Sequence, residues 1–328
     1  MEVRDIFMRR MVVFFVLTLV CLSVFSGDVF ASSEEAKEVV ATQPASTTPW
    51  WVWPVSLFVL TFVLGVVAVL GGVGGGVLFV PIVSGFFPFH LDFVRGAGLL
   101  VALAGALAAG PDLLRKGMAN LRLVLPVGLI ASACAIVGAM MGLALPTNVV
   151  QTSLGITILA IVVIIIKAKK SEFPEVKQAD YLSTALRING IYYEPATGKE
   201  INWQIHRTLH GFILFIVIGV MAGMFGLGAG WANVPVLNLL MGAPLKVSVA
   251  SSKFLLSITD TSAAWIYVNN GAVLPMMVVP SMIGIMLGSV VGVRILAKTK
   301  PAAIRYIVIF LLLFSGLRSL LKGLEIWK

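Results

Sequence analysis

Long apolar runs separated by short polar stretches dominate the pattern along this chain. They recur between residues 52 and 166 and again between residues 209 and 321. A hydrocarbon core about 30 Å thick requires roughly 20 apolar residues of helix, and most of these runs approach that length. The pattern therefore predicts an all-α polytopic membrane protein. Apolar helices are expected at Val52–Leu70, Val77–Phe89, Val94–Gly110, Leu123–Leu145, Val149–Ile166, Leu209–Phe225, Val234–Met241, Val247–Val268, Ala272–Val293 and Ala302–Leu321.

Two glycine-rich interruptions divide the apolar runs and repeat each other without a gap. Gly72 and Pro81 of the first correspond to Gly226 and Pro235 of the second, with an offset of 154 residues (235 − 81 = 154). The same offset persists well beyond the two interruptions. One structural unit is therefore expected to occur twice.

Each interruption is followed by a short apolar limb. The limb Val77–Phe89 reaches only about 20 Å as a helix, which is less than the hydrocarbon core. We therefore expect two inverted repeats, each a glycine-broken helical hairpin plus three transmembrane helices. This arrangement places the basic residues of 115–122 and 167–207 on the cytoplasmic side, where Lys and Arg are favoured.

Composition supports a membrane protein and changes how the charge is interpreted. Hydrophobic residues make up 59% of the chain and charged residues only 12%, against about 25% in a soluble domain. The net charge of +9 would suit nucleic acid, but membrane orientation explains it better, so no nucleic-acid partner is predicted. Cys21 and Cys134 lie in apolar runs and provide no disulfide framework.

The chain is expected to divide into six parts. Two arginines and an apolar run before Ala31 indicate a signal peptide, with an uncleaved first transmembrane helix as the alternative. The predicted parts are the signal peptide at 1–31, an extracytoplasmic linker at 32–52, the first transmembrane repeat at 53–166, a cytoplasmic connector at 167–207, the second transmembrane repeat at 208–321 and a tail at 322–328.

Residues Ile188–Trp203 alternate around a Pro-Ala-Thr-Gly turn, which predicts a small β-hairpin within the connector. We interpret it as an ordinary link between the repeats, with a docking element as the alternative.

The glycine breaks are the main candidate for a binding site. Backbone that leaves the helical form at membrane depth is tolerated only inside protein or beside a watery cavity. The limb after each break begins with free N–H groups and the positive end of a helix dipole, which attract anions. Two inverted hairpins would bring these ends together near the membrane midplane. The residues expected to line this site are Gly74, Gly75, Gly76, Gly228, Ala229 and Gly230.

Close helix packing is the alternative role for such glycines, and it is the one we favour for Gly71 and Gly72. The glycine runs do not resemble nucleotide-binding loops, since no Lys-Ser/Thr pair follows them and no βαβ pattern surrounds them.

The repeated motif resembles the sulfite exporter TauE/SafE family, also called the TSUP transporters. The resemblance rests on the glycines of Gly72–Gly76 and Gly226–Gly230 with the following Val-Pro pairs, and it covers about Trp53–Leu321. Ala229 replaces the middle glycine of the second copy. The resemblance implies transport of sulfite, sulfonates or related small organic anions by a multi-pass protein of the cytoplasmic, or inner, membrane.

Polar residues in the second repeat add candidates for substrate binding. Ser251, Ser252 and Lys253 lie in an expected apolar helix, and Asn233 follows the second break. The side chain of Lys253 could instead extend to the cytoplasmic interface. Asn233 could instead cap backbone groups.

Asp260 is the candidate for ion coupling. It lies near the middle of Val247–Val268, where a carboxylate is costly unless it faces a cavity, a partner or a proton path. Lys253 is two helical turns earlier and can share its face. We predict that Asp260 binds a coupling proton while Lys253 draws the anion from the cytoplasmic side. The alternative is a structural hydrogen bond from Asp260 to a Ser or Thr of a neighbouring helix.

Secondary transport of a small anion is thus the leading functional hypothesis, with the lipid bilayer and coupled protons as further partners. A passive anion channel is the alternative. An intramembrane enzyme is disfavoured because the spans hold no convincing catalytic set. His206 and His210 have no supporting cluster for a metal, and no cofactor is predicted. The oligomeric state is not indicated.

The glycine hypothesis predicts the effect of adding side chains at the breaks. Replacing Gly75 or Gly230 by Leu should abolish anion transport while the protein still reaches the membrane, because the side chain blocks close backbone approach. Uptake into proteoliposomes and membrane fractionation measure the two effects. Normal transport by either variant would show that the glycines only pack helices.

Overall fold

The computed structural model describes residues 49, 51–71, 74–115, 119–167, 174, 176, 178–194, 199–296 and 301–325. The predicted signal peptide and nearly all of the predicted linker lie outside these residues. Contacts divide the chain into two units, Met1–Pro49 and Trp50–Lys328, and the description below concerns the second.

The second unit is built almost entirely of helices, which confirms the all-α polytopic class. The elements are α3 (Val52–Gly71), α4 (Gly75–Phe86), α5 (Leu91–Arg115), α6 (Leu121–Ala144), α7 (Thr147–Lys167), α8 (Tyr181–Ala185), β1 (Asn189–Glu194), β2 (Lys199–Gln204), α9 (Thr208–Phe225), α10 (Gly230–Pro235), the π-helix η1 (Val236–Leu240), α11 (Leu245–Asn269), α12 (Pro275–Leu296) and α13 (Pro301–Gly323). Among the described residues, α5, α6, α7, α9 and α12 are long and apolar enough to cross a membrane.

Local sequence explains where several helices begin and end. Helix α4 stops at Phe86 because Phe87 precedes Pro88 and adopts an extended conformation, which the residue before a proline favours. Helix α6 begins after Asn120, whose side chain accepts a hydrogen bond from the backbone N–H of Leu123. Helix α5 begins at Leu91, three residues before the start that its apolar pattern predicts, and therefore includes Asp92.

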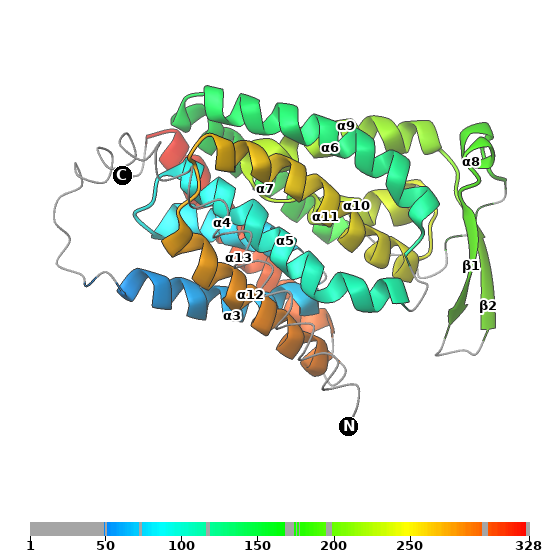
Figure 1. The fold of residues 1–328 in the computed structure, drawn as a ribbon, viewed down its shortest axis with the longest axis horizontal. Coiled ribbons are helices and arrows are strands. Elements are labelled where there is room, and N and C mark those ends of the chain that lie inside the picture. Colours follow the sequence, from blue (N-terminus) through cyan, green and yellow to red (C-terminus); the bar gives the residue numbers. More distant parts are fainter. Residues whose placement is uncertain are drawn as a thin grey trace. The chain divides into compact units, whose positions relative to one another are not determined.

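Helices of the first half pack mainly on helices of the second half. The major pairs are α3 with α12, α6 with α9, α7 with α13, α6 with α11 and α5 with α11. Helices α6 and α9 run beside each other on one side of the bundle, and α3 runs beside α12 on the other (Figure 1). When each helix is exchanged for its counterpart in the other half, the pair α3–α12 becomes the pair α9–α6.

Two glycine contacts show that this exchange holds at the level of single residues. A Cβ atom added to Gly65 on α3 would lie 2.7 Å from the carbonyl oxygen of Ile285. A Cβ atom added to Gly219 on α9 would lie 2.5 Å from the carbonyl oxygen of Ala131. Gly219 and Ile285 each follow their counterparts by the repeat offset (219 − 65 = 285 − 131 = 154). The sequence repeat is thus matched by equivalent contacts, while the inversion of the halves across the membrane stays a prediction.

The predicted β-hairpin of the connector is present. Strands β1 and β2 pair antiparallel, with Asn189 opposite Gln204, and its turn lies outside the described residues. Trp203 of β2, together with Ile188 and Ile205 beside the strands, is buried in the main hydrophobic core. The hairpin stands at the end of the bundle where α6 begins (Figure 1), and Asn120 donates a side-chain hydrogen bond to the Asn189 carbonyl.

Asp180 joins this connector to the second repeat. Its carboxylate accepts hydrogen bonds from the Ser183 N–H at the start of α8 and from the N–H and hydroxyl of Thr208 at the start of α9. Burial alone raises the pKa of Asp180, but the hydrogen bonds from Ser183 and Thr208 outweigh it and hold this pKa below its ordinary value.

Removing this carboxylate should loosen the connector. Asp180→Ala is expected to cost about 1 kcal/mol, typical of a lost N-cap, whereas Asp180→Asn keeps a capping oxygen and should cost less. Limited trypsin digestion at Arg187 and Arg207, both exposed, measures the change. Equal resistance of wild type and Asp180→Ala would contradict this role.

The lowered pKa also sets the sign of the pH dependence. The stabilisation is present above the unfolded-state pKa and is lost as the pH falls through the folded-state pKa of Asp180. Cleavage of the wild-type connector by pepsin should therefore rise in that acid range, with a smaller rise for Asp180→Asn.

Candidate functional site

The two glycine breaks touch each other. A Cβ atom added to Gly230 would lie 3.3 Å from the Cα of Gly74, and one added to Gly74 would lie 3.6 Å from the Cα of Gly230. The predicted contact between the two breaks is therefore confirmed. Gly72 lies outside the described residues, Pro81 lies inside α4, and Pro235 is the last residue of α10.

Glycine serves a different purpose in each break. In the second, Gly226 and Gly228 have φ angles of +68° and +67°, a left-handed conformation that side chains disfavour. In the first, the requirement is space. A Cβ atom on Gly76 would lie 2.7 Å from the Leu227 carbonyl oxygen and 2.9 Å from that of Gly98. The second break thus needs glycine for its backbone conformation, and the first needs it for the space that lets backbone approach backbone.

Asp260 lies against the second break. Its side chain is fully buried, and a Cβ atom on Gly228 would lie 2.9 Å from its Oδ2 atom. The Ala229 N–H is close to this carboxylate, yet neither oxygen has a partner with ordinary hydrogen-bond geometry among the described residues. Lys253 of the same helix is near enough for electrostatic attraction. The alternative of a structural hydrogen bond to Ser or Thr is not what the described side chains show.

The predicted site residue Asn233 and the neighbour of Asp260 in sequence, Thr259, share this lack of partners. Asn233 is 1% exposed, and within the described part of the chain neither its amide nitrogen nor its amide oxygen is hydrogen-bonded. The buried hydroxyl of Thr259 likewise has no hydrogen-bond partner among the described residues. A buried polar group without a partner is costly, so such groups are typical of places where water, an ion or a ligand completes the bonding.

Lys253 and the first break border the same small cavity. The cavity has a volume of about 10 Å³, and its lining includes Gly74, Gly75, Lys253 and Ser289. This is room for about one water molecule. The structure therefore brings Lys253 to the first glycine break, beside a space too small for an anion. Ser289 of α12 was not identified from the sequence, because its apolar surroundings resemble those of any packing serine.

The two serines before Lys253 have different surroundings. The hydroxyl of Ser251 accepts a hydrogen bond of 3.4 Å from the backbone N–H of Asn120. Since Asn120 also bonds to the β-hairpin, Ser251 is linked to the connector. Ser252 is 3% exposed on α11. The predicted role of both serines in substrate binding stays a prediction.

Arg95 is a buried cation that the sequence reading did not assign to the site. It is 1% exposed, and its Nη1 donates a hydrogen bond of 2.9 Å to the Met224 carbonyl at the end of α9. Its Nη2 is paired with Asp92, and its guanidinium lies 5.7 Å from the centre of the Tyr267 ring. The sequence places Arg95 next to a polar loop, so only the tertiary contacts show that it reaches the second break.

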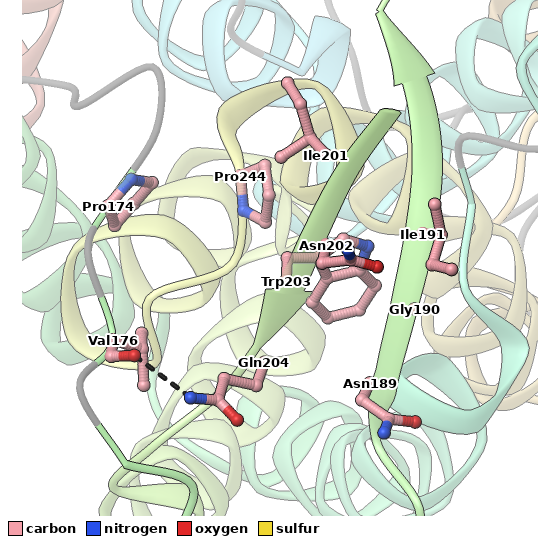
Figure 2. A pocket seen from close by; sticks show the side chains of 10 residues that line it. All are labelled: Pro174, Val176, Asn189, Gly190, Ile191, Ile201, Asn202, Trp203, Gln204 and Pro244. Atoms are coloured by element: carbon pink, nitrogen blue, oxygen red, sulfur yellow. Dashed lines mark hydrogen bonds between the residues drawn. The ribbon is translucent and has the colours of Figure 1, made fainter. Parts of the chain in front are cut away.

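A larger hollow of about 930 Å³ lies apart from the glycine breaks. Trp203, Gln204 and Pro244 are among its lining residues, between the hairpin and the start of α11 (Figure 2). Gln204 donates a hydrogen bond of 3.0 Å to the Val176 carbonyl at its edge (Figure 2). None of the predicted site residues lines it, so the candidate site remains at the breaks. In the described part of the chain, no three His, Cys, Asp or Glu side chains are grouped as metal ligands.

Comparison with known proteins identifies the class of the molecule. The family model described as sulfite exporter TauE/SafE matches residues 57–319. The probable membrane transporter protein YunE of Bacillus subtilis (strain 168) is 22% identical over 278 residues, which cover 82% of this chain and 98% of YunE. The probable membrane transporter protein ORF9 of Sinorhizobium sp is 27% identical over 254 residues, or 76% of this chain and 84% of ORF9. No solved structure matches significantly.

The crowding at Gly76 gives a prediction with a matched control. Gly76→Ala would push a methyl group against two carbonyl oxygens, so it should lower the free energy of unfolding by about 1–3 kcal/mol. Gly105→Ala adds the same methyl group with only a 3.7 Å contact to Ile285, so it should be tolerated. Thermal unfolding in detergent compares the two variants, and equal midpoints would show that the breaks can separate without cost.

Proposed function

Because the chain belongs to the sulfite exporter TauE/SafE family of membrane transporters, we propose that it is a secondary transporter of a small anion. The proposed substrate class is sulfite, sulfonates and related organosulfur anions. The proposed location is the cytoplasmic membrane, which is the inner membrane of a cell with two. The observation that carries the proposal is the contact of the two glycine breaks beside Lys253 and the unpartnered Asp260.

An anion at this position would meet attractive groups from both halves. Lys253 supplies a positive charge at the cavity, and the amino end of α4 directs free backbone N–H groups toward it. The unpartnered amide of Asn233 offers a further donor beside the second break. Oxyanions accept several hydrogen bonds at once, which matches a set of donors on different elements.

We further propose that Asp260 binds a coupling proton. A protonated carboxyl would let the site hold an anion without repulsion from a second negative charge. A carboxylate would instead attract Lys253 and compete with the anion for it. Proton and anion occupancy would thus favour each other, which is the requirement for coupled movement.

The small volume of the cavity favours a transporter over a channel. A channel needs a continuous polar path, whereas a site that opens to one side at a time passes through a closed state. The volume of about 10 Å³ beside the first break is too small for a sulfur oxyanion, so the site must open for transport. Saturable flux that depends on a gradient would support this mechanism, and non-saturating conductance would indicate the channel.

The substrate class is tested by uptake into proteoliposomes holding the purified full chain. We expect flux of at least one compound among sulfite, thiosulfate, sulfoacetate and taurine, with sulfate as a comparison. Lys253→Gln should reduce that flux strongly. Absence of flux for every compound would exclude the proposed substrate class.

Proton coupling is tested by measuring the same flux with and without a pH gradient. Wild type should respond to the gradient, and Asp260→Asn should lose that response because it cannot exchange a proton. Thr261→Ala, at an exposed position of the same helix, serves as the control. A full response to the gradient in Asp260→Asn would show that Asp260 is not the coupling residue.

A further inference from the structure

We propose that Arg95 is a second anion-binding residue of the transport path, and that the Asp92 carboxylate occupies it in this structure in place of the substrate. The inference rests on the proposed function of anion transport. It concerns the end of the molecule at which α5 begins, whereas Lys253 serves the other break.

Arg95 is placed at the second break by contacts on several sides. Its backbone crowds Gly226, where an added Cβ atom would clash with the Arg95 carbonyl oxygen. Its Nη1 bonds the Met224 carbonyl, and the Tyr267 hydroxyl donates to the neighbouring Gly223 carbonyl at 2.9 Å. The guanidinium is thus held at the carboxyl end of α9, just before the second break begins at Gly226. Gly228 of the same break lies against Asp260.

The donors of Arg95 are only partly used by the backbone. Its Nε atom has no partner among the described residues although the side chain is 1% exposed. Its Nη2 atom is paired with Oδ1 of Asp92. A guanidinium presents its donors as a planar fork that suits two oxygens of one carboxylate or oxyanion. The carboxylate now on Nη2 and the free Nε together define where such an anion would bind.

The Asp92 carboxylate is placed so that it can move away from Arg95. Its side chain is 29% exposed, whereas that of Arg95 is 1% exposed, so solvent reaches the pair from the Asp92 side. The other oxygen of Asp92 lies 3.5 Å from Nδ1 of His90, a side chain that is half-exposed. Rotation of the Asp92 side chain would therefore free Nη2 of Arg95 without moving a helix.

The repeat gives Arg95 an approximate counterpart in Lys253. The two residues lie on the equivalent helices α5 and α11, one helical turn apart in the repeat register (253 − 95 = 158 against 154). Lys253 borders the first break and Arg95 the second. Each half thus provides a cation to the break of the other half, so an anion would find one on either approach.

A simpler role for Arg95 is to hold α5 on α9, with Asp92 as a helix-terminal charge. The two roles predict different effects of the substitutions on anion affinity. If Asp92 competes with the substrate, removing its charge strengthens anion binding while removing Arg95 weakens it. If the pair is only structural, Asp92→Asn and Arg95→Gln damage the same bond and act in the same direction.

The experiment is an anion titration of the purified full chain in detergent, followed by thermal unfolding at constant ionic strength. Sulfite and isethionate are the probes and chloride is the control. We expect Asp92→Asn to bind the probe at least threefold more tightly than wild type and Arg95→Gln at least tenfold more weakly. Arg95→Lys should lie between wild type and Arg95→Gln, because an ammonium lacks the planar fork.

Each result decides a separate question. Opposite shifts for Asp92→Asn and Arg95→Gln support the competition, while shifts in one direction, or none, overturn it. Lys253→Gln reports the proposed site independently of Arg95. A wild type that binds and transports neither probe nor any compound of the uptake panel would overturn the proposed function, and the role of Arg95 with it.

Discussion

The structure depends on the requirement that backbone leaving the helical form in an apolar environment be enclosed by protein. Each glycine break meets this requirement by lying against the other break. Gly76 approaches the carbonyls of Leu227 and Gly98 too closely for any side chain, and Gly230 approaches Gly74. The chain therefore needs two breaks, since a single one would have nothing of the right shape to cover it. The same contact brings exposed N–H groups and the buried Asp260 to one place.

The two halves share equivalent helix contacts, but their charged residues lie at different positions of the repeat. Gly65 and Gly219 make equivalent contacts with carbonyls of the opposite half, so the packing follows the repeat closely. The charges do not. Asp260 has Ala106 as its counterpart, and Arg95 has Val249. A repeated framework can therefore present different groups at its two glycine breaks while keeping its helix contacts intact.

Much of the fold could be predicted from the sequence because apolar length and glycine pattern directly reflect the bilayer and the close packing of helices. The helices, the hairpin and the contact of the breaks follow from such local signals. Arg95 could not be placed, because its burial depends on Met224 and Tyr267, which are distant in sequence. Ser251 likewise has its partner at Asn120, over a hundred residues away. The role of a charged or hydroxyl group depends on neighbours that are distant in sequence, and the hydrophobic periodicity of the chain does not reveal those neighbours.

The pairing of α3 with α12 also has a consequence for how the protein is made. Roughly 200 residues separate the end of α3 from the start of α12. At about 5–20 residues per second, synthesis of that stretch takes about 10–40 s. During this interval Gly65 has not yet met the Ile285 carbonyl against which it packs. The first half therefore waits in the bilayer with this face of α3 against lipid or an insertion factor, and its packing is completed only when the second half arrives.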